Sequence, residues 1–94
     1  MSSDNLVEHQ PESRRFVISM QGEEAVLRYS FVDERTVDYY STFVPPSRRG
    51  EGIGSRLVEH ALEWARRENY LVRASCPFVD AVLRRHKSYA DLRA

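Results

Sequence analysis

Hydrophobic and polar positions alternate in the first half of the chain and follow a helical period in the second. Phe16, Val17 and Ile18 form a short run of β-formers, and residues 21–24 supply a polar turn. From Ala25 to Val32 the side chains alternate, with the odd-numbered positions the more apolar set. Alternation of this kind is typical of a half-buried strand, so the two runs predict a β-hairpin.

Residues Val37 to Val44 are rich in β-branched and aromatic side chains and predict a third strand. Pro45 and Pro46 end it, because proline cannot donate to the ladder. The pair Tyr39 and Tyr40 must place one ring on each face of this strand.

A helical period begins after a Gly/Arg-rich loop. Ile53, Leu57, Ala61 and Ala65 recur every four residues and predict an amphipathic helix over about 55–68. Residues 70–74 read as a fourth strand, and Pro77 suits the first position of a second helix that runs to about residue 86. The predicted order is therefore β-β-β-α-β-α.

Composition limits the classes of function. The chain has 94 residues, 14 basic and 14 acidic side chains and zero net charge, which indicates one domain at 14–94 after a polar, flexible arm at 1–13. Neutrality excludes nucleic-acid binding through a bulk positive field. Cys76 is the single cysteine, which is typical of a reducing compartment. The polar N-terminus and the lack of a long apolar run predict a cytoplasmic protein without a membrane partner.

The loop between the third strand and the first helix is the strongest chemical signal. Glycines at a strand-to-helix turn let backbone N–H groups approach a phosphate. The segment 49–54 has no Gly-Lys-Ser/Thr ending, so it is no Walker loop, and Ser55 stands where a dinucleotide fingerprint needs glycine. It does fit Arg/Gln-x-x-Gly-x-Gly, through Arg49, Gly52 and Gly54. Taken alone, the loop fits a glycine-rich turn without a ligand equally well.

Further segments make the pattern more specific. Val44-Pro45-Pro46, the loop 48–54, Cys76-Pro77-Phe78, Arg84-Arg85-His86 and Tyr89 to Leu92 closely resemble short stand-alone members of the GNAT superfamily of N-acetyltransferases, of the YjdJ type. The resemblance spans roughly residues 14–92. It implies an α+β fold with a mixed, mostly antiparallel sheet and helices packed on it, and acetyl-CoA as the cofactor.

The resemblance also implies which residues hold the cofactor. The strand end would lie along the pantetheine arm, the loop would bind the pyrophosphate, and the start of the second helix would lie near the acetyl group. The cofactor-binding residues are then Thr42, Phe43, Val44, Arg48, Arg49, Gly50, Glu51, Gly52, Ile53, Gly54, Ser55, Cys76, Pro77 and Phe78. The Glu51 side chain should point away from the phosphates, since both are negative.

Catalytic candidates are fewer. Cys76 would be the N-cap of the second helix, where the helix dipole favours a thiolate, and it either contacts the acetyl group or accepts it. Ser41 occupies a position where this family usually has His, and Ser is a poor base. Tyr89 is the remaining candidate acid, with His86 and Asp91 as further proton-transfer groups. The histidines and Cys76 have no metal-site spacing.

Two classes of function remain. One is an enzyme that transfers an acetyl group from acetyl-CoA directly to an unidentified primary amine, on a small molecule or a protein. The other is a non-catalytic module that binds acetyl-CoA or CoA. RNA binding through the Arg pairs is a third possibility, disfavoured by zero net charge and the lack of a nucleic-acid motif.

Overall fold

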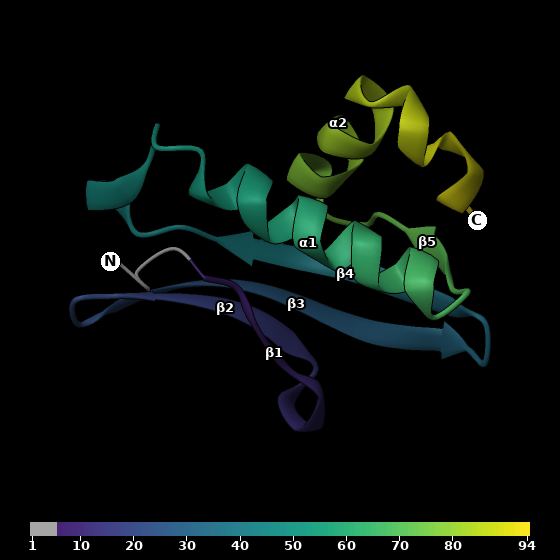
Figure 1. The fold of residues 1–94 in the computed structure, drawn as a ribbon, viewed down its shortest axis with the longest axis horizontal. Coiled ribbons are helices and arrows are strands. Elements are labelled where there is room, and N and C mark those ends of the chain that lie inside the picture. Colours follow the sequence, from purple (N-terminus) through teal and green to yellow (C-terminus); the bar gives the residue numbers. More distant parts are fainter. Residues whose placement is uncertain (1–5) are drawn as a thin grey trace.

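The computed structural model describes residues 6–94 as a five-stranded sheet with two helices on one of its faces (Figure 1). Strand order follows the sequence, from β1 to β5. The first four strands pair antiparallel, and β4 and β5 pair parallel. The helices and strands are β1 (Glu8–Gln10), β2 (Arg15–Met20), β3 (Glu23–Asp33), β4 (Thr36–Phe43), α1 (Ile53–Arg67), β5 (Leu71–Arg73) and α2 (Pro77–Arg85). The predicted mixed, mostly antiparallel sheet with packed helices is confirmed.

The core lies between the sheet and α1, as the alternating pattern predicted. Phe16 and Ile18 of β2 and Leu27 of β3 are fully buried, and so are Leu57 and Ala61 of α1. Tyr39 joins the two layers, because its buried hydroxyl donates to the Ala61 carbonyl oxygen over 2.7 Å. Burial raises the pKa of the Tyr39 phenol well above its usual range, so this donor keeps its proton. Helix α1 is thereby fixed over β4.

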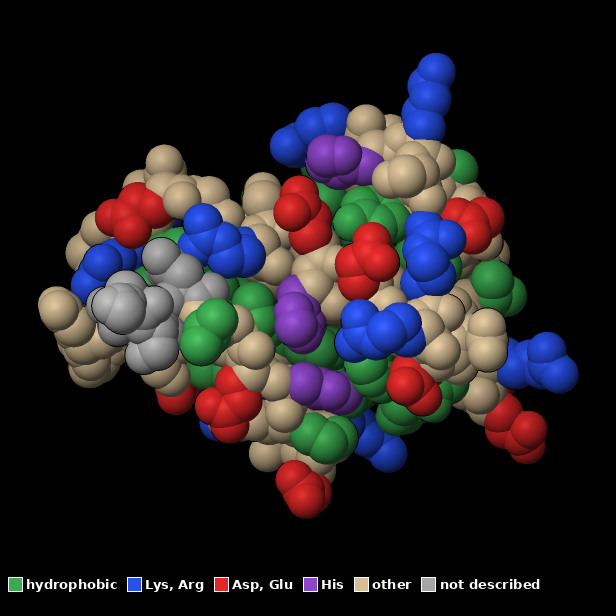
Figure 2. All heavy atoms as spheres, viewed as in Figure 1, with side chains coloured by type: hydrophobic (Ala, Val, Ile, Leu, Met, Phe, Trp, Pro, Cys, Tyr) green, Lys and Arg blue, Asp and Glu red, His purple; other side chains and the backbone are tan. Residues whose placement is uncertain are grey.

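The N-terminal segment differs from the loose arm expected for residues 1–13. Residues 1–5 lie outside the described part, but Glu8–Gln10 form β1 and pair with β2. The His9 ring stacks on Phe16 with centroids 4.2 Å apart, and its Nε2 lies 2.7 Å from the Tyr29 hydroxyl. In the view of Figure 2, histidine side chains lie next to one another near the centre, and another lies near the upper edge. These aromatic contacts explain why such a polar segment is ordered.

A bulge in β4 resets the side-chain alternation. Tyr39 is opposite Tyr29, but the next pair is Ser41 with Arg28, so Tyr40 is an extra residue without a partner in β3. Tyr39 is buried under α1, whereas Tyr40 is about half exposed. Beyond the bulge, Thr42 pairs with buried Leu27 and therefore faces the helices.

Candidate functional site

The site begins where β4 and β5 separate. The two strands pair only from Thr36 to Asp38, and the Cys76 N–H then donates to the Tyr39 carbonyl over 3.0 Å. After Cys76 the chain turns into α2, while β4 continues to Phe43. Within the part of the chain that the structure describes, the outer edge of β4 beyond Tyr39 has no neighbouring strand. Its backbone groups can therefore pair with an extended ligand.

The loop between β4 and α1 forms the second wall. Pro46–Arg48 make a 3₁₀ turn, and Gly50 and Gly52 have φ of 89° and 80°. Gly52 is the N-cap of α1, where the left-handed backbone leads directly into the first helical turn. The first N–H groups of that turn, from Ile53 onward, have no acceptor within the helix. Such a terminus can therefore donate hydrogen bonds to an anion.

A cavity of about 500 Å³ lies between this loop, the end of β4 and the start of α2. Apolar side chains, loop backbone and two arginines form its walls. The residues that line it are Thr42, Val44, Arg48, Arg49, Gly50, Gly52, Ile53, Gly54, Ser55 and Phe78. Every one of them belongs to the cofactor set that the sequence predicted, whereas Phe43, Glu51, Cys76 and Pro77 of that set are not in the lining.

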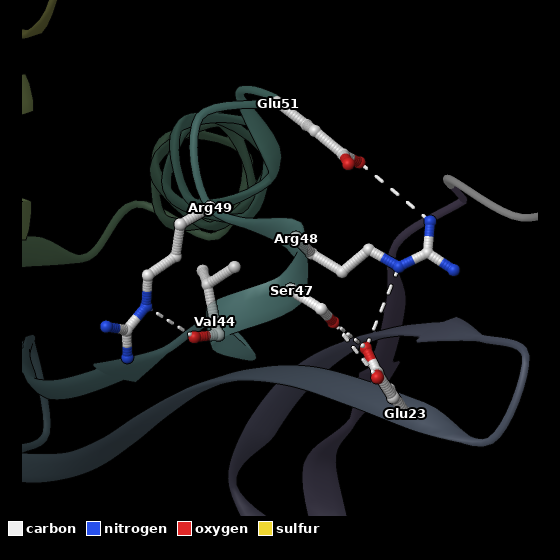
Figure 3. Close-up of polar contacts among 6 residues, drawn as sticks. All are labelled: Glu23, Val44, Ser47, Arg48, Arg49 and Glu51. Carbon is white, nitrogen blue, oxygen red and sulfur yellow. Dashed lines mark hydrogen bonds and ion pairs between the residues drawn. The ribbon is translucent and has the colours of Figure 1, made fainter.

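Two consecutive arginines point in different directions (Figure 3). The Arg49 Nε donates to the Val44 carbonyl over 3.0 Å, which lays the guanidinium along the end of β4. The Arg48 side chain instead turns to the β2–β3 hairpin, where its Nε lies 3.7 Å from a Glu23 carboxylate oxygen. A Glu51 carboxylate oxygen lies 3.9 Å from the Arg48 Nη1. The Arg49 terminal nitrogens are thus the ones aimed along the cavity wall.

Cys76 lies under the cavity, in contact with one of its lining residues. It is the N-cap of α2, with Pro77 at the first helical position as predicted. Its side chain is 7% exposed, and the Sγ lies 3.4 Å from the Thr42 hydroxyl. The bulge at Tyr40 is what turns Thr42 toward Cys76, because it shifts the alternation by one residue.

Phe78 covers the start of α1. A Cβ at Gly54 would lie 3.0 Å from two carbons of the Phe78 ring and 3.5 Å from Val44. Glycine at position 54 therefore lets the two helix N-termini approach closely. The ring is 39% exposed and forms part of the cavity wall.

The proton-transfer candidates lie elsewhere. Ser41 pairs with exposed Arg28, which puts its side chain on the sheet face opposite the helices. Tyr89 is buried against α1, and burial together with nearby Glu63 raises the pKa of its phenol. His86 lies 3.8 Å from Glu59, and Asp91 pairs with Arg66 at 2.9 Å. None of these four lines the cavity.

Glu23 and Ser47 form a contact that the sequence did not predict. The Ser47 hydroxyl donates to both Glu23 carboxylate oxygens, at 2.9 and 3.0 Å. The two residues are 24 positions apart, in a hairpin turn and a loop, so no periodic pattern connects them. Among residues 6–94, no group of three or more His, Cys, Asp or Glu side chains is arranged to hold a metal ion. No helix of that part is long and apolar enough to cross a membrane.

This chain is similar to known proteins in sequence and in fold. Protein NATD1 of Xenopus tropicalis is 34% identical over 80 residues, covering 83% of this chain and 73% of that protein. Protein NATD1 of Danio rerio is 30% identical over 89 residues, covering 90% and 81%. The NMR structure of a GCN5-like candidate N-acetyltransferase from Staphylococcus aureus superimposes with a TM-score of 0.79 at 27% identity, covering 99% of this chain and 91% of that one.

The family model for GCN5-related N-acetyl-transferases matches residues 15–92, which is nearly the whole described chain. This range includes every segment that borders the cavity: β4, the loop, α1 and α2. The protein therefore belongs to the GCN5-related N-acetyltransferase family.

Proposed function

We propose that this protein binds acetyl-CoA in the cavity beside β4 and transfers the acetyl group directly to a primary amine. The observation that carries the proposal is the coincidence of three features at one cavity: an unpaired strand edge, a glycine loop and a helix N-terminus. Each suits a different part of the cofactor. Acetyl-CoA supplies an acetyl thioester that a neutral primary amine attacks, with N-acetylated amine and free CoA as products.

The loop residues fit a pyrophosphate. A Cβ built at Gly50 or Gly52 would meet no atom within 4 Å, so open space lies beside this backbone. The N–H groups of the first turn of α1 and the Arg49 guanidinium can then donate to phosphate oxygens. Charge-assisted bonds of this kind are roughly twice as strong as neutral ones.

The end of the cavity near Thr42 is proposed to hold the acetyl group. Thr42 would then contact the thioester region with Cys76 directly behind it, and Phe78 would cover the thioester. Holding the thioester and the amine in a fixed orientation is the main contribution expected of a site with so few polar groups. Cys76 supports Thr42 in this scheme, and the amine is the nucleophile.

A second function, as a non-catalytic acetyl-CoA or CoA-binding module, is favoured by one observation. The ionisable side chains among the cavity-lining residues are two arginines, and neither can accept a proton from an amine at neutral pH. Of the predicted proton-transfer groups, Ser41 lies on the opposite face of the sheet and Tyr89 does not line the cavity. The acceptor amine would then have to lose its proton to water.

Nucleic acid is not a proposed partner. Acidic and basic side chains are interspersed over the face seen in Figure 2, without a continuous basic stripe. The two arginines at the cavity are also divided between separate contacts.

The test is binding first and transfer second. Calorimetry with CoA should give one site per chain. Gly52→Asp should weaken CoA binding by at least about tenfold, equivalent to about 1.4 kcal/mol, because a carboxylate beside the loop repels the phosphates. Gly52→Asn is the matched control, since it has the same shape and tolerance of left-handed backbone without the charge.

Transfer is then measured as CoA release from acetyl-CoA in the presence of a panel of amines. Release that depends on one amine supports the enzyme, whereas tight binding without release supports the module. If neither CoA nor acetyl-CoA binds, both functions are excluded. Equal affinity of the Gly52→Asp and Gly52→Asn variants would contradict the loop assignment.

A further inference from the structure

Glu23 does not line the cavity, yet it contacts the loop that does. It is the first residue of β3, which extends past the last pair with β4 at Val26 and Phe43. By alternation, Glu23 lies on the same face as buried Ala25 and Leu27, which is the face covered by α1. The β2–β3 hairpin and the loop before α1 lie at the same end of the molecule (Figure 1).

The Glu23 carboxylate makes two kinds of contact there (Figure 3). Both of its oxygens accept from the Ser47 hydroxyl, at 2.9 and 3.0 Å, and one lies 3.7 Å from the Arg48 Nε. Ser47 and Arg48 belong to the 3₁₀ turn that begins the loop. Glu23 of the sheet thus binds the loop just before Gly50 and Gly52.

The contact of Glu23 with the loop can affect binding, because the loop's own sequence constrains the rest of its backbone poorly. Gly50 and Gly52 adopt left-handed backbone, and glycine explores many alternatives at little cost. Ordering such a loop when a ligand binds would reduce affinity by the entropy lost. A contact that orders it in the free protein avoids that loss.

We propose that Glu23 is a positioning residue for cofactor binding, which holds the loop in its binding geometry through Ser47 and Arg48. The inference rests on the proposed function of the cavity. Glu23 also keeps the Arg48 side chain at the hairpin, so that Arg49 alone extends along β4.

Electrostatics alone predicts the opposite effect for this residue. Glu23 is a negative charge near a site for a polyanion, so removing it should strengthen binding if the charge acted only through its field. Glu24 supplies the matched control. It is the next residue, has the same charge, is exposed and lies on the opposite face of the sheet.

The experiment measures the CoA dissociation constant of the full chain and its variants by calorimetry. Glu23→Ala should weaken CoA binding about fivefold, whereas Glu24→Ala should leave it unchanged or slightly tighter. Ser47→Ala should weaken it by a smaller factor, and adding Ser47→Ala to Glu23→Ala should have no further effect. Ser47→Ala carries the test by itself if the Glu23 variant does not fold.

A second readout needs no ligand. The backbone amides of Gly50 and Gly52 should show increased fast motion by ¹⁵N relaxation in Glu23→Ala and not in Glu24→Ala. If the unmodified chain fails to bind CoA, the proposed function falls, and this readout still decides whether Glu23 orders the loop. Equal or tighter CoA binding by Glu23→Ala, or unchanged loop amides, overturns the inference.

Discussion

Gly54 is the residue at which the two helix N-termini come closest. A Cβ there would lie 3.0 Å from the Phe78 ring, closer than real Cβ atoms are normally found to another heavy atom. Its backbone is helical and carries no positive φ, so the requirement for glycine is one of space. Glycine in a helix usually costs roughly 0.5–1 kcal/mol relative to alanine. At this position the close approach to Phe78 offsets that cost.

Gly54→Ala should therefore affect the cavity more than the fold. The gain in helix propensity and the crowding against Phe78 oppose each other, so we expect the free energy of unfolding to change by less than about 1 kcal/mol. The partly exposed ring must move, and the cavity it lines should bind CoA several-fold more weakly. Urea unfolding and calorimetry measure the two quantities. Gly54→Ala/Phe78→Ala should bind CoA as well as Phe78→Ala alone; a further loss in the double variant would contradict steric coupling.

A substitution at Cys76 distinguishes direct acetyl transfer to the amine from transfer through the Cys76 thiol. If the thiol does not accept the acetyl group, Cys76→Ala should retain acetyl transfer to a good amine. The lost packing should cost about 1 kcal/mol of stability, since the side chain is almost fully buried. The measurement is CoA release, with Thr42→Val as a control that removes the other partner of the 3.4 Å contact. Complete loss of release by a folded Cys76→Ala variant would indicate a nucleophilic thiol.

The strand β4 explains which parts of the site were predictable. Thr42, Val44 and most of the loop line the cavity, and the sequence brought them together because the loop motif is contiguous along the chain. The pattern did not predict which face of the sheet Ser41 occupies. Uninterrupted alternation from Tyr39 would have turned the Ser41 side chain toward the helices. One extra residue at Tyr40 reverses the faces of all later positions in the strand. Whether a strand contains a bulge depends on its partners and is not encoded in its own pattern.

The strand β1 was missed for a related reason. Its sequence is polar, and besides its pairing with β2 it contacts the core through the His9 ring, which lies against Phe16, Tyr29 and Trp64. No local alternation signals such a contact. The Glu23–Ser47 bond is similar, since it joins a turn to a loop. The sequence therefore predicts elements with their own hydrophobic period better than it predicts segments fixed by one long-range contact.

The pairing of β1 should depend on pH through His9. Burial, followed by the nearby His60 ring, lowers the pKa of His9 below its usual 6.5, although Glu68 opposes this. The unfolded chain then binds the proton more readily, so stability is complete above pH 6.5 and decreases as the pH falls through the lower folded value. Urea unfolding at pH 7.5 and 5.5 should show this decrease, and His9→Gln should reduce it. His60 also has a lowered pKa, so part of the decrease remains. An identical pH dependence in the variant would contradict the assignment to His9.

The size of the molecule limits what this fold can contain. With 94 residues and one core, almost every element either forms the sheet-helix packing or borders the cavity. The cavity is formed by segments that also build this core, and the predicted proton-transfer residues do not line it. A small domain is also only marginally stable, by about 5–15 kcal/mol, so a ligand bound to the folded state changes its stability by a large fraction.

Cofactor binding should therefore stabilise the whole molecule. The cavity joins β4, α1 and α2, which share the single core, so a ligand bound there opposes global unfolding. At a CoA concentration 100 times its dissociation constant, the gain is about 2.7 kcal/mol. For a domain of this length each kcal/mol of added unfolding free energy raises Tm by roughly 4–8 °C. The Tm should therefore rise by about 10 °C or more. Gly52→Asp should lose most of this shift and Gly52→Asn should keep most of it. A shift of the same size in Gly52→Asp would mean that CoA stabilises the fold from another site.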